Sequence, residues 1–396
     1  MANAFELHVG EFRRFEATLP DKAPAKTTAA WALEEQSGKK RPLGEGLSFG
    51  YVAPARLLNK DVTLSYKLTI PKAKPNSFKL KIVAQAPTTP PTKPVTAKVA
   101  DGWSSDDKVH AASVGEGGPF FVGQRVRWGK DAKAARRGLL LFGDSAQTFF
   151  SPGDFTKPDL PALKHWVDVI ACSTDVEGKS AFEALNTYDR ASFTFGLIQF
   201  GAHTYNDNFH AFLRRAMLAY EEDAKNYFPE LRVQGDDLEH RTSVEPERWV
   251  PLTQRSVADN AALRRFIKPD PLKVTVSEVL FAARMIHWTR AQKGLQTLMV
   301  EMAVERAKAN LRDVSKEMDG KGIALCAAVF DIRLQGRGSN TQIRKALTSK
   351  EPLKALLAIK KGTPGETKRL DRLRQLIEDR LVTSPVKYHA DKDELK

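Results

Sequence analysis

One stretch of the chain, residues 169–215, decides the fold and reads VIACSTDVEGKSAFEALNTYDRASFTFGLIQFGAHTYNDNFHAFLRR. Its apolar spacing predicts an amphipathic helix that ends near Asp175, with Glu177 just past that end. A run of small and polar residues follows, and SFTFGLIQF then alternates like a strand beside Asp189. HTYNDN supplies residues that commonly begin a helix. The predicted order is therefore helix, Glu177, hairpin with Asp189, helix.

Downstream of this stretch, helical periodicity dominates the sequence. Helices are expected over residues 160–172, 208–228, 276–314, 322–335, 339–359 and 366–381. The 276–314 stretch is one long helix or two helices that meet near Gly294. GIALCAAVFDIRLQ is almost wholly apolar at its start, which predicts a central buried helix. The only strand-like piece expected in this half is the hairpin around Asp189.

Upstream, residues 1–85 read as a β-sandwich-like module, because short alternating segments are separated by Pro, Gly, Asn and Asp. A Pro-rich connection and a Gly-rich segment with strand patterns fill residues 86–155. That segment is either a second small β unit or a lead-in to the next domain. Residues 156–396 form the helical domain. The fold class expected is α+β and multidomain.

Composition limits the function classes. The net charge is +14 with a pI near 9.6, which favours anionic partners such as nucleic acid, anionic lipid or a bacterial wall. Residues 173–247 depart from this, with fourteen acids against seven Lys or Arg. We see no secretory signal and no apolar run long enough to span a membrane. Cys172 and Cys326 lie in apolar stretches, as small buried groups or as one disulfide. No His or Cys cluster has metal-ligand spacing, so no metal or cofactor is expected.

The Glu177 and Asp189 carboxyls suit the hydrolysis of a glycosidic bond, which uses two carboxyl groups in unlike environments. A Glu held by an apolar pocket stays protonated and donates to the leaving oxygen. An ionised Asp on a hairpin activates water or stabilises the cationic sugar. Asp175 and Glu183 are rival acids close by in the sequence.

These residues resemble the lysozyme-like superfamily, which includes phage and goose-type lysozymes, lytic transglycosylases and chitosanases. DRASFTFGLIQF is similar to the phage-lysozyme hairpin, FGLIQF resembles a step of the goose-type enzymes, and AAVFDIRLQGRG is similar to the buried final helix of the group. The resemblance covers about Leu160 to Leu347 and implies a mainly α catalytic domain with a small β-hairpin. The connection between Glu177 and Asp189 is longer than in phage lysozymes.

The resemblance implies roles for individual residues. Glu177 is the general acid and Asp189 the base or water-orienting carboxylate, although goose-type enzymes and transglycosylases work without the second carboxylate. Thr194 and Gln199 line the cleft, and Tyr188, Arg190 and His203 help to bind sugar.

The expected function is a muramidase-type glycoside hydrolase that cuts β-1,4 bonds of bacterial cell-wall glycan. Chitosanase and lytic transglycosylase activities of the same fold stay open. The chain is expected to be made in the cytoplasm without a signal peptide and to act at the cell wall or in the periplasm of a target cell. These expectations fit an endolysin or an antibacterial secreted effector. Residues 1–85 would then dock a secretion-machinery component, and an immunity protein is a further expected partner. Two other classes are a non-enzymatic delivery protein and a nucleic-acid binder. The second is disfavoured because the basic residues do not gather around stacking aromatics. No membrane insertion is expected.

Overall fold

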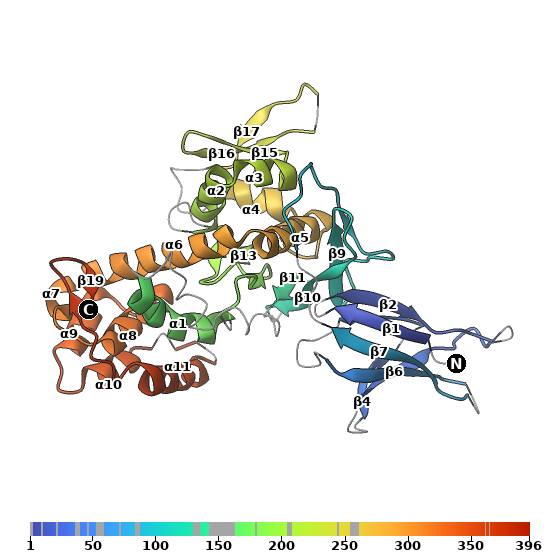
Figure 1. The fold of residues 1–396 in the computed structure, drawn as a ribbon, viewed down its shortest axis with the longest axis horizontal. Coiled ribbons are helices and arrows are strands. Elements are labelled where there is room, and N and C mark those ends of the chain that lie inside the picture. The colour runs from blue at the N-terminus through green and yellow to red at the C-terminus, as the bar shows by residue number, and fades with distance from the viewer. Residues whose placement is uncertain are drawn as a thin grey trace.

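The computed structural model describes residues 3–8, 11–20, 23–35, 40–45, 47–52, 59–70, 73–83, 88–129, 135–141, 163–178, 180–203, 208–243, 245–253, 261–360, 362–363 and 365–396. Within these ranges the chain is a mixed α/β protein with several sheets and eleven helices, most of them in its C-terminal half (Figure 1). None of these helices combines the length and apolar character that a membrane span requires. Both expected domain boundaries, at 85 and at 155, lie outside the described residues.

The N-terminal part is β-rich, as predicted. Its strands are β1 (Asn3–His8), β2 (Phe12–Glu16), β3 (Ala29–Glu35), β4 (Lys40–Glu45), β5 (Ser48–Val52), β6 (Asp61–Leu68) and β7 (Asn76–Val83). One sheet has the order β1-β7-β6-β3-β4, with β1 parallel to β7, and β2 pairs with β5 in another. Alternate residues such as Trp31, Leu33 and Leu64 enter one core. The ring centroids of Phe15 in β2 and Phe78 in β7 lie 4.9 Å apart, so the two sheets share that core.

A seven-stranded sheet joins the Gly-rich segment to the hairpin that the sequence predicts. Its strands are β8 (Ala97–Val99), β9 (Val109–Val114), β10 (Phe120–Trp128), β11 (Arg136–Leu141), β12 (Leu185–Asn186), β13 (Thr194–Phe195) and β14 (Phe200–Gly201). They pair antiparallel in the order β14-β13-β12-β11-β10-β9-β8. Val122 and Leu139 of this sheet belong to the same apolar core as the helices. The strands before residue 142 therefore share one sheet with β12–β14 and one apolar core with the helices.

The helices pack around this sheet and one another. They are α1 (Lys164–Gly178), α2 (Phe209–Ala219), α3 (Glu221–Tyr227), α4 (Ala261–Ile267), α5 (Val276–Ala291), α6 (Lys293–Arg312), α7 (Ser315–Met318), α8 (Ile323–Leu334), α9 (Asn340–Leu347), α10 (Pro352–Leu357) and α11 (Glu366–Arg380). The stretch 276–314 contains two long helices, and Gln292 separates them. Helix α8 is buried along nearly its whole length, which confirms the prediction of a central buried helix.

Two expected single helices are each broken in two. The 208–228 stretch forms α2 and α3, with Tyr220 between them. The 339–359 stretch ends one helix at Leu347 and begins another at Pro352. Proline lacks the amide hydrogen that a continuing helix needs but suits the first turn of a new one, which accounts for this second break.

The predicted strand SFTFGLIQF is wrong in its extent. Only Thr194–Phe195 and Phe200–Gly201 are strands, and a turn joins them. Gly196 has φ 85° and Gln199 has φ 54°, and two left-handed residues bend the chain back on itself. The segment is thus a hairpin in its own right, paired to β12 on one side.

The expectation that the hairpin holds the only strands of this half is also wrong. A separate antiparallel sheet consists of β15 (Leu231–Gln234), β16 (Asp237–Arg241) and β17 (Trp249–Pro251), and β18 (Tyr388–His389) pairs with β19 (Glu394–Leu395). The first three strands carry few buried residues, so they lack the alternating apolar pattern that identifies a strand. The Gly235–Asp236 dipeptide between β15 and β16 is a hairpin signal that the sequence did contain.

Candidate active site

Glu177 lies in the last turn of α1, which runs to Gly178 rather than ending near Asp175. Its side chain is 19% exposed, so the carboxylate is within reach of solvent. Its backbone carbonyl accepts a hydrogen bond from Nε2 of Gln199 at 3.0 Å. Gln199 belongs to the turn between β13 and β14. The predicted acid and one predicted cleft residue are therefore joined directly, helix end to hairpin.

The Glu177 carboxylate is ion-paired, whereas the sequence predicted an apolar pocket around it. Oε1 accepts a hydrogen bond from Nε of Arg369 in α11 at 2.6 Å. Arg369 also binds both oxygens of Asp331, at 2.6 and 3.1 Å, and Asp331 is fully buried in α8. Arg337 binds Asp331 as well, at 2.5 Å. Burial disfavours the Arg369 cation, but its bonds to Asp331 and Glu177 outweigh burial and raise its pKa above the ordinary value.

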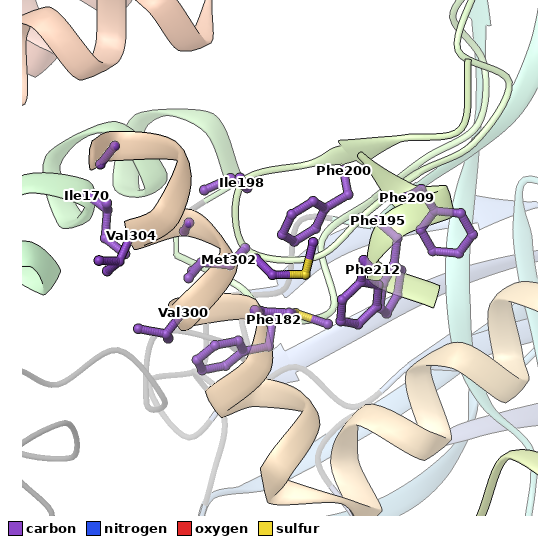
Figure 2. Packing of buried hydrophobic residues seen from close by; sticks show 14 of the residues in the cluster. Ile170, Phe182, Phe195, Ile198, Phe200, Phe209, Phe212, Val300, Met302 and Val304 are labelled. Carbon is purple, nitrogen blue, oxygen red and sulfur yellow. The ribbon is translucent and has the colours of Figure 1, made fainter. Parts of the chain in front are cut away.

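The hairpin has one apolar and one polar face. Leu185, Phe195 and Phe200 lie opposite one another on adjacent strands and enter the core, where Phe200 stacks on Phe212 of α2 with ring centroids 5.3 Å apart (Figure 2). The next row consists of Asn186, Thr194 and Gly201. Paired residues share a face of a sheet, so this row points away from the phenylalanines.

The His203 imidazole lies over Gly201, the residue that pairs with Thr194. A Cβ on Gly201 would lie 2.8 Å from Nδ1 of His203, so the imidazole covers Gly201 beside Thr194. Thr194 is 6% exposed, and its Oγ1 has no hydrogen-bond partner among the described residues. A buried hydroxyl without a partner costs free energy and is uncommon in native proteins. Within the described residues the Thr194 hydroxyl is therefore an unsatisfied buried polar group.

Asp189 lies in the loop between β12 and β13, and its carboxylate is oriented by local bonds. Oδ2 accepts from Nδ2 of Asn186 at 3.1 Å, and Oδ1 accepts from the Ala191 amide at 2.8 Å. Nη1 of Arg136 donates to the Asp189 carbonyl at 2.9 Å. Burial, and then the charge of Asp189, raise the pKa of the Tyr188 phenol above its ordinary value. Because Asn186 pairs with Thr194, the Asp189 carboxylate is linked to the polar face of the hairpin.

A buried network anchors this loop to α5. Oγ1 of Thr187 accepts from the Leu139 amide at 2.6 Å and donates to Oε1 of Glu278. Oε2 of Glu278 accepts from Nζ of Lys268 at 2.5 Å, and both side chains are almost completely buried. Burial lowers the pKa of the Lys268 amine and raises that of the Glu278 carboxyl, against the pull of the partner charge. A Cβ on Gly138 would lie 2.5 Å from the Thr187 carbonyl carbon, so only glycine permits this approach.

The remaining candidates are placed differently. Arg190 is exposed, and its carbonyl accepts from Nη1 of Arg264 at 2.9 Å. The rival acid Glu183 is engaged in a two-bond pair with Arg290, at 3.0 and 2.8 Å. Asp175 lies within α1 and has Arg372 and Arg380 at 3.7 Å. Of the three acids near the helix end, only Glu177 is bonded to the hairpin turn through its own backbone.

Sequence reasoning missed Arg369, Asp331 and Asn186. Asp331 did carry a signal, because one carboxylate inside an apolar helix requires a charged partner. Cys172 and Cys326 are free and buried, and burial raises the pKa of both thiols to about 12, so the buried-group alternative is confirmed. Among the described residues, no three His, Cys, Asp or Glu side chains gather closely enough to hold a metal ion.

No protein-family model matches this sequence, and no curated protein is significantly similar to it.

Proposed function

We propose that this chain is a lysozyme-like glycoside hydrolase that cuts β-1,4 bonds of bacterial cell-wall glycan, with Glu177 as general acid. The observation that carries the proposal is the bond from Gln199 to the backbone of Glu177. It fixes the helix end against the turn between β13 and β14, and the loop that holds Asp189 enters the same strand β13 from β12, so the two carboxyls come from segments that are tied to one strand. Glycosidic hydrolysis uses two carboxyl groups that flank the scissile bond, and we assign these roles to Glu177 and Asp189.

In this proposal the Glu177 carboxylate takes up a proton from solvent, which its 19% exposed side chain can reach, and donates that proton to the leaving oxygen of the scissile bond. The Arg369 guanidinium holds the carboxylate in place through Oε1 and leaves Oε2 for the substrate. Two bonds to the buried Asp331 fix Arg369 independently of Glu177. The carboxyl can therefore lose and regain its proton while the arginine stays where it is.

Asp189 orients the attacking water or stabilises the cationic sugar. Each of its oxygens accepts one bond, from Asn186 or from the Ala191 amide, and each keeps further acceptor capacity. The two bonds fix the direction of the carboxylate, and a pre-oriented group needs little rearrangement during reaction. Where the two carboxyls leave room for a water molecule, hydrolysis inverts the anomeric centre.

Substrate hydroxyls bind to polar groups of the hairpin. The Thr194 hydroxyl is buried and has no hydrogen-bond partner within the described chain, so a sugar hydroxyl supplies the bond that it lacks. Tyr188, Arg190, Gln199 and His203 complete this set. The charge of +14 attracts the protein to an anionic wall. A secreted effector, docked to its secretion machinery through the N-terminal β-sheets and paired with an immunity protein, is the setting that we propose.

The test is cleavage of isolated peptidoglycan by the wild type and Glu177→Gln, with soluble fragments identified by mass spectrometry. Glutamine keeps the shape and can still accept a hydrogen bond from Arg369, but it has no proton to transfer. The expected result is disaccharide-peptides from the wild type and none from the variant. Reducing ends then indicate hydrolysis, and anhydro-sugars indicate lytic transglycosylation.

Asp175→Asn is the matched control, because it neutralises another carboxylate at the same helix end. The two arginines near Asp175 lie 3.7 Å from it and form no close hydrogen bond with it. This variant should cut like the wild type. A Glu177→Gln protein that folds and cuts at the wild-type rate would overturn the assignment. A wild type that releases nothing from peptidoglycan or from chitosan would overturn the function.

A further inference from the structure

Trp128 exposes more of its side chain than any other tryptophan of the chain. It is 52% exposed, whereas Trp31, Trp166 and Trp288 are at most 2% exposed and the other two are partly buried. A single exposed hydrophobic side chain is common on protein surfaces, so the surroundings of Trp128 decide whether it marks a binding site. Trp128 plays no part in the core or in the carboxylate site described above.

The sheet register places Trp128 beside the Asp189 loop. Trp128 is the last residue of β10 and lies directly opposite Arg136 of β11, so the two side chains share a face of the sheet. Arg136 reaches from that position to the Asp189 carbonyl, 2.9 Å from its Nη1. Two residues further along β11, on the same face, Gly138 lies under Thr187. The loop that carries Asp189 thus crosses the face from which Trp128 projects.

The backbone beneath Trp128 is well supported. Five consecutive residues of β10, ending at Trp128, pair with β11. Gly129 then turns with φ 118°, and a Cβ there would lie 3.4 Å from the Cα of Ala135, so the two strands stay close beyond the last pair. A side chain on paired strands is held more exactly than one on a free loop.

The chemistry of this surface fits a sugar ring. A pyranose has faces of C–H groups and a rim of hydroxyls. An exposed indole offers an apolar face together with one N–H donor. Arg136 keeps guanidinium N–H groups beyond the one given to Asp189, and these can donate to hydroxyl or carboxylate oxygens. The pairing of a flat aromatic with fixed donors is a common design of small-ligand sites.

We propose that Trp128 stacks on a sugar ring of the bound glycan, beside Arg136, and so forms a binding subsite next to the Asp189 loop. The inference rests on the proposed function, because it names a substrate-binding residue for the same site. Trp128 contributes to binding and does not take part in proton transfer. Its removal therefore raises KM and leaves kcat nearly unchanged.

The experiment compares Trp128→Ala, Trp128→Tyr and the wild type on soluble glycan strands freed of their stem peptides. Trp128→Ala should raise KM about tenfold, the factor that a stacked aromatic ring contributes to a small-ligand site, with kcat within about twofold. Trp128→Tyr should restore most of the affinity, since it keeps a flat aromatic ring. Trp249→Ala is the control, because Trp249 lies under Arg232 in the separate β15–β17 sheet and should leave both constants unchanged.

A second measurement separates this inference from the proposed function. Calorimetric titration of the same strands into Glu177→Gln, with and without Trp128→Ala, reports binding without turnover. Loss of affinity on removing Trp128 supports the subsite even if no cleavage is ever seen. If the wild type cleaves glycan but Trp128→Ala changes neither KM nor binding affinity, the subsite is overturned and the proposed function is not. The same titration is repeated with single-stranded DNA. If Trp128→Ala weakens binding to the DNA and leaves glycan binding unchanged, the surface is a nucleic-acid site and the sugar subsite is overturned.

Discussion

Oε1 of Glu177 lies 2.6 Å from Nε of Arg369, although 192 residues separate the two in the chain. The same guanidinium binds the buried Asp331 through its other nitrogens. Arg369 therefore joins α1, α8 and α11 at one point and presents the Glu177 carboxylate from that junction. The consequence is that a residue of the C-terminal helix controls the geometry of the proposed acid.

Arg369→Lys should lower kcat about tenfold to a hundredfold with little change in KM. A lysine ammonium is a point charge and cannot bind Glu177 and both oxygens of Asp331 in one plane. Steady-state kinetics on peptidoglycan test this. Arg369→Ala should also cost about 3 kcal/mol of unfolding free energy, because it leaves the buried Asp331 with a single partner.

The control for Arg369 is Arg372→Ala. Arg372 is 51% exposed and reaches Asp175 only at 3.7 Å, so its loss should change stability by less than about 1 kcal/mol. Urea unfolding of all three variants gives the comparison. Equal kcat in Arg369→Lys and the wild type would show that Arg369 is structural and does not position the acid.

Gly138→Ala should impair activity and stability together. The new Cβ would meet the carbonyl carbon, oxygen and Oγ1 of Thr187 at 2.5 to 2.6 Å, and backbone atoms cannot move aside as a flexible side chain can. The loop that holds Asp189 is then displaced, with a loss of about 1 to 3 kcal/mol typical of overpacking. Gly118→Ala is the matched control, since nothing lies within 4 Å of a Cβ there. Thermal unfolding and peptidoglycan turnover of both variants test this prediction. If Gly138→Ala keeps the stability and activity of the wild type, the close approach of Thr187 to Gly138 is contradicted.

Stability should fall as pH is lowered from about 6.5 to 4, in part because of His110 and His287. Burial lowers the pKa of both imidazoles from 6.5 to about 4. In this window the unfolded chain binds protons that the folded chain does not, so the free energy of unfolding decreases with falling pH, by up to about 3 kcal/mol for each residue. Urea titrations at several pH values measure the slope. His110→Asn with His287→Asn should flatten it, and an unchanged slope contradicts the assignment.

Local sequence signals predicted much of the fold. Periodicity identified α1, α8 and α11, because the apolar stripe of a helix is written in neighbouring residues. The break at Pro352 was also present in the sequence, but the apolar spacing of 339–359 continues across it. The β15–β17 sheet was missed because its strands bury few residues and so show no alternation.

For the candidate site, the sequence indicated which elements come together but not which side chains bind one another. The resemblance to the lysozyme-like superfamily implied that Gln199 lines the cleft beside the acid, and Gln199 is bonded to the backbone of Glu177. The ion pair with Arg369 could not be foreseen, since nothing near either residue indicates a contact across 192 positions. The same holds for Gly138, whose necessity comes from a backbone that approaches from another part of the chain.

Two threonines of the hairpin region should respond oppositely to replacement by valine. Thr194→Val removes a buried hydroxyl that has no bond within the described chain, so stability should stay constant or rise by up to about 1 kcal/mol while activity falls. Thr187→Val removes a hydroxyl bonded to the Leu139 amide and to Glu278, so stability should fall by about 2 to 3 kcal/mol. Valine keeps the shape of threonine in both places, which leaves hydrogen bonding as the difference. Urea unfolding and glycan turnover of the two variants test this. A destabilised Thr194→Val with full activity would mean that its hydroxyl serves the fold rather than the substrate.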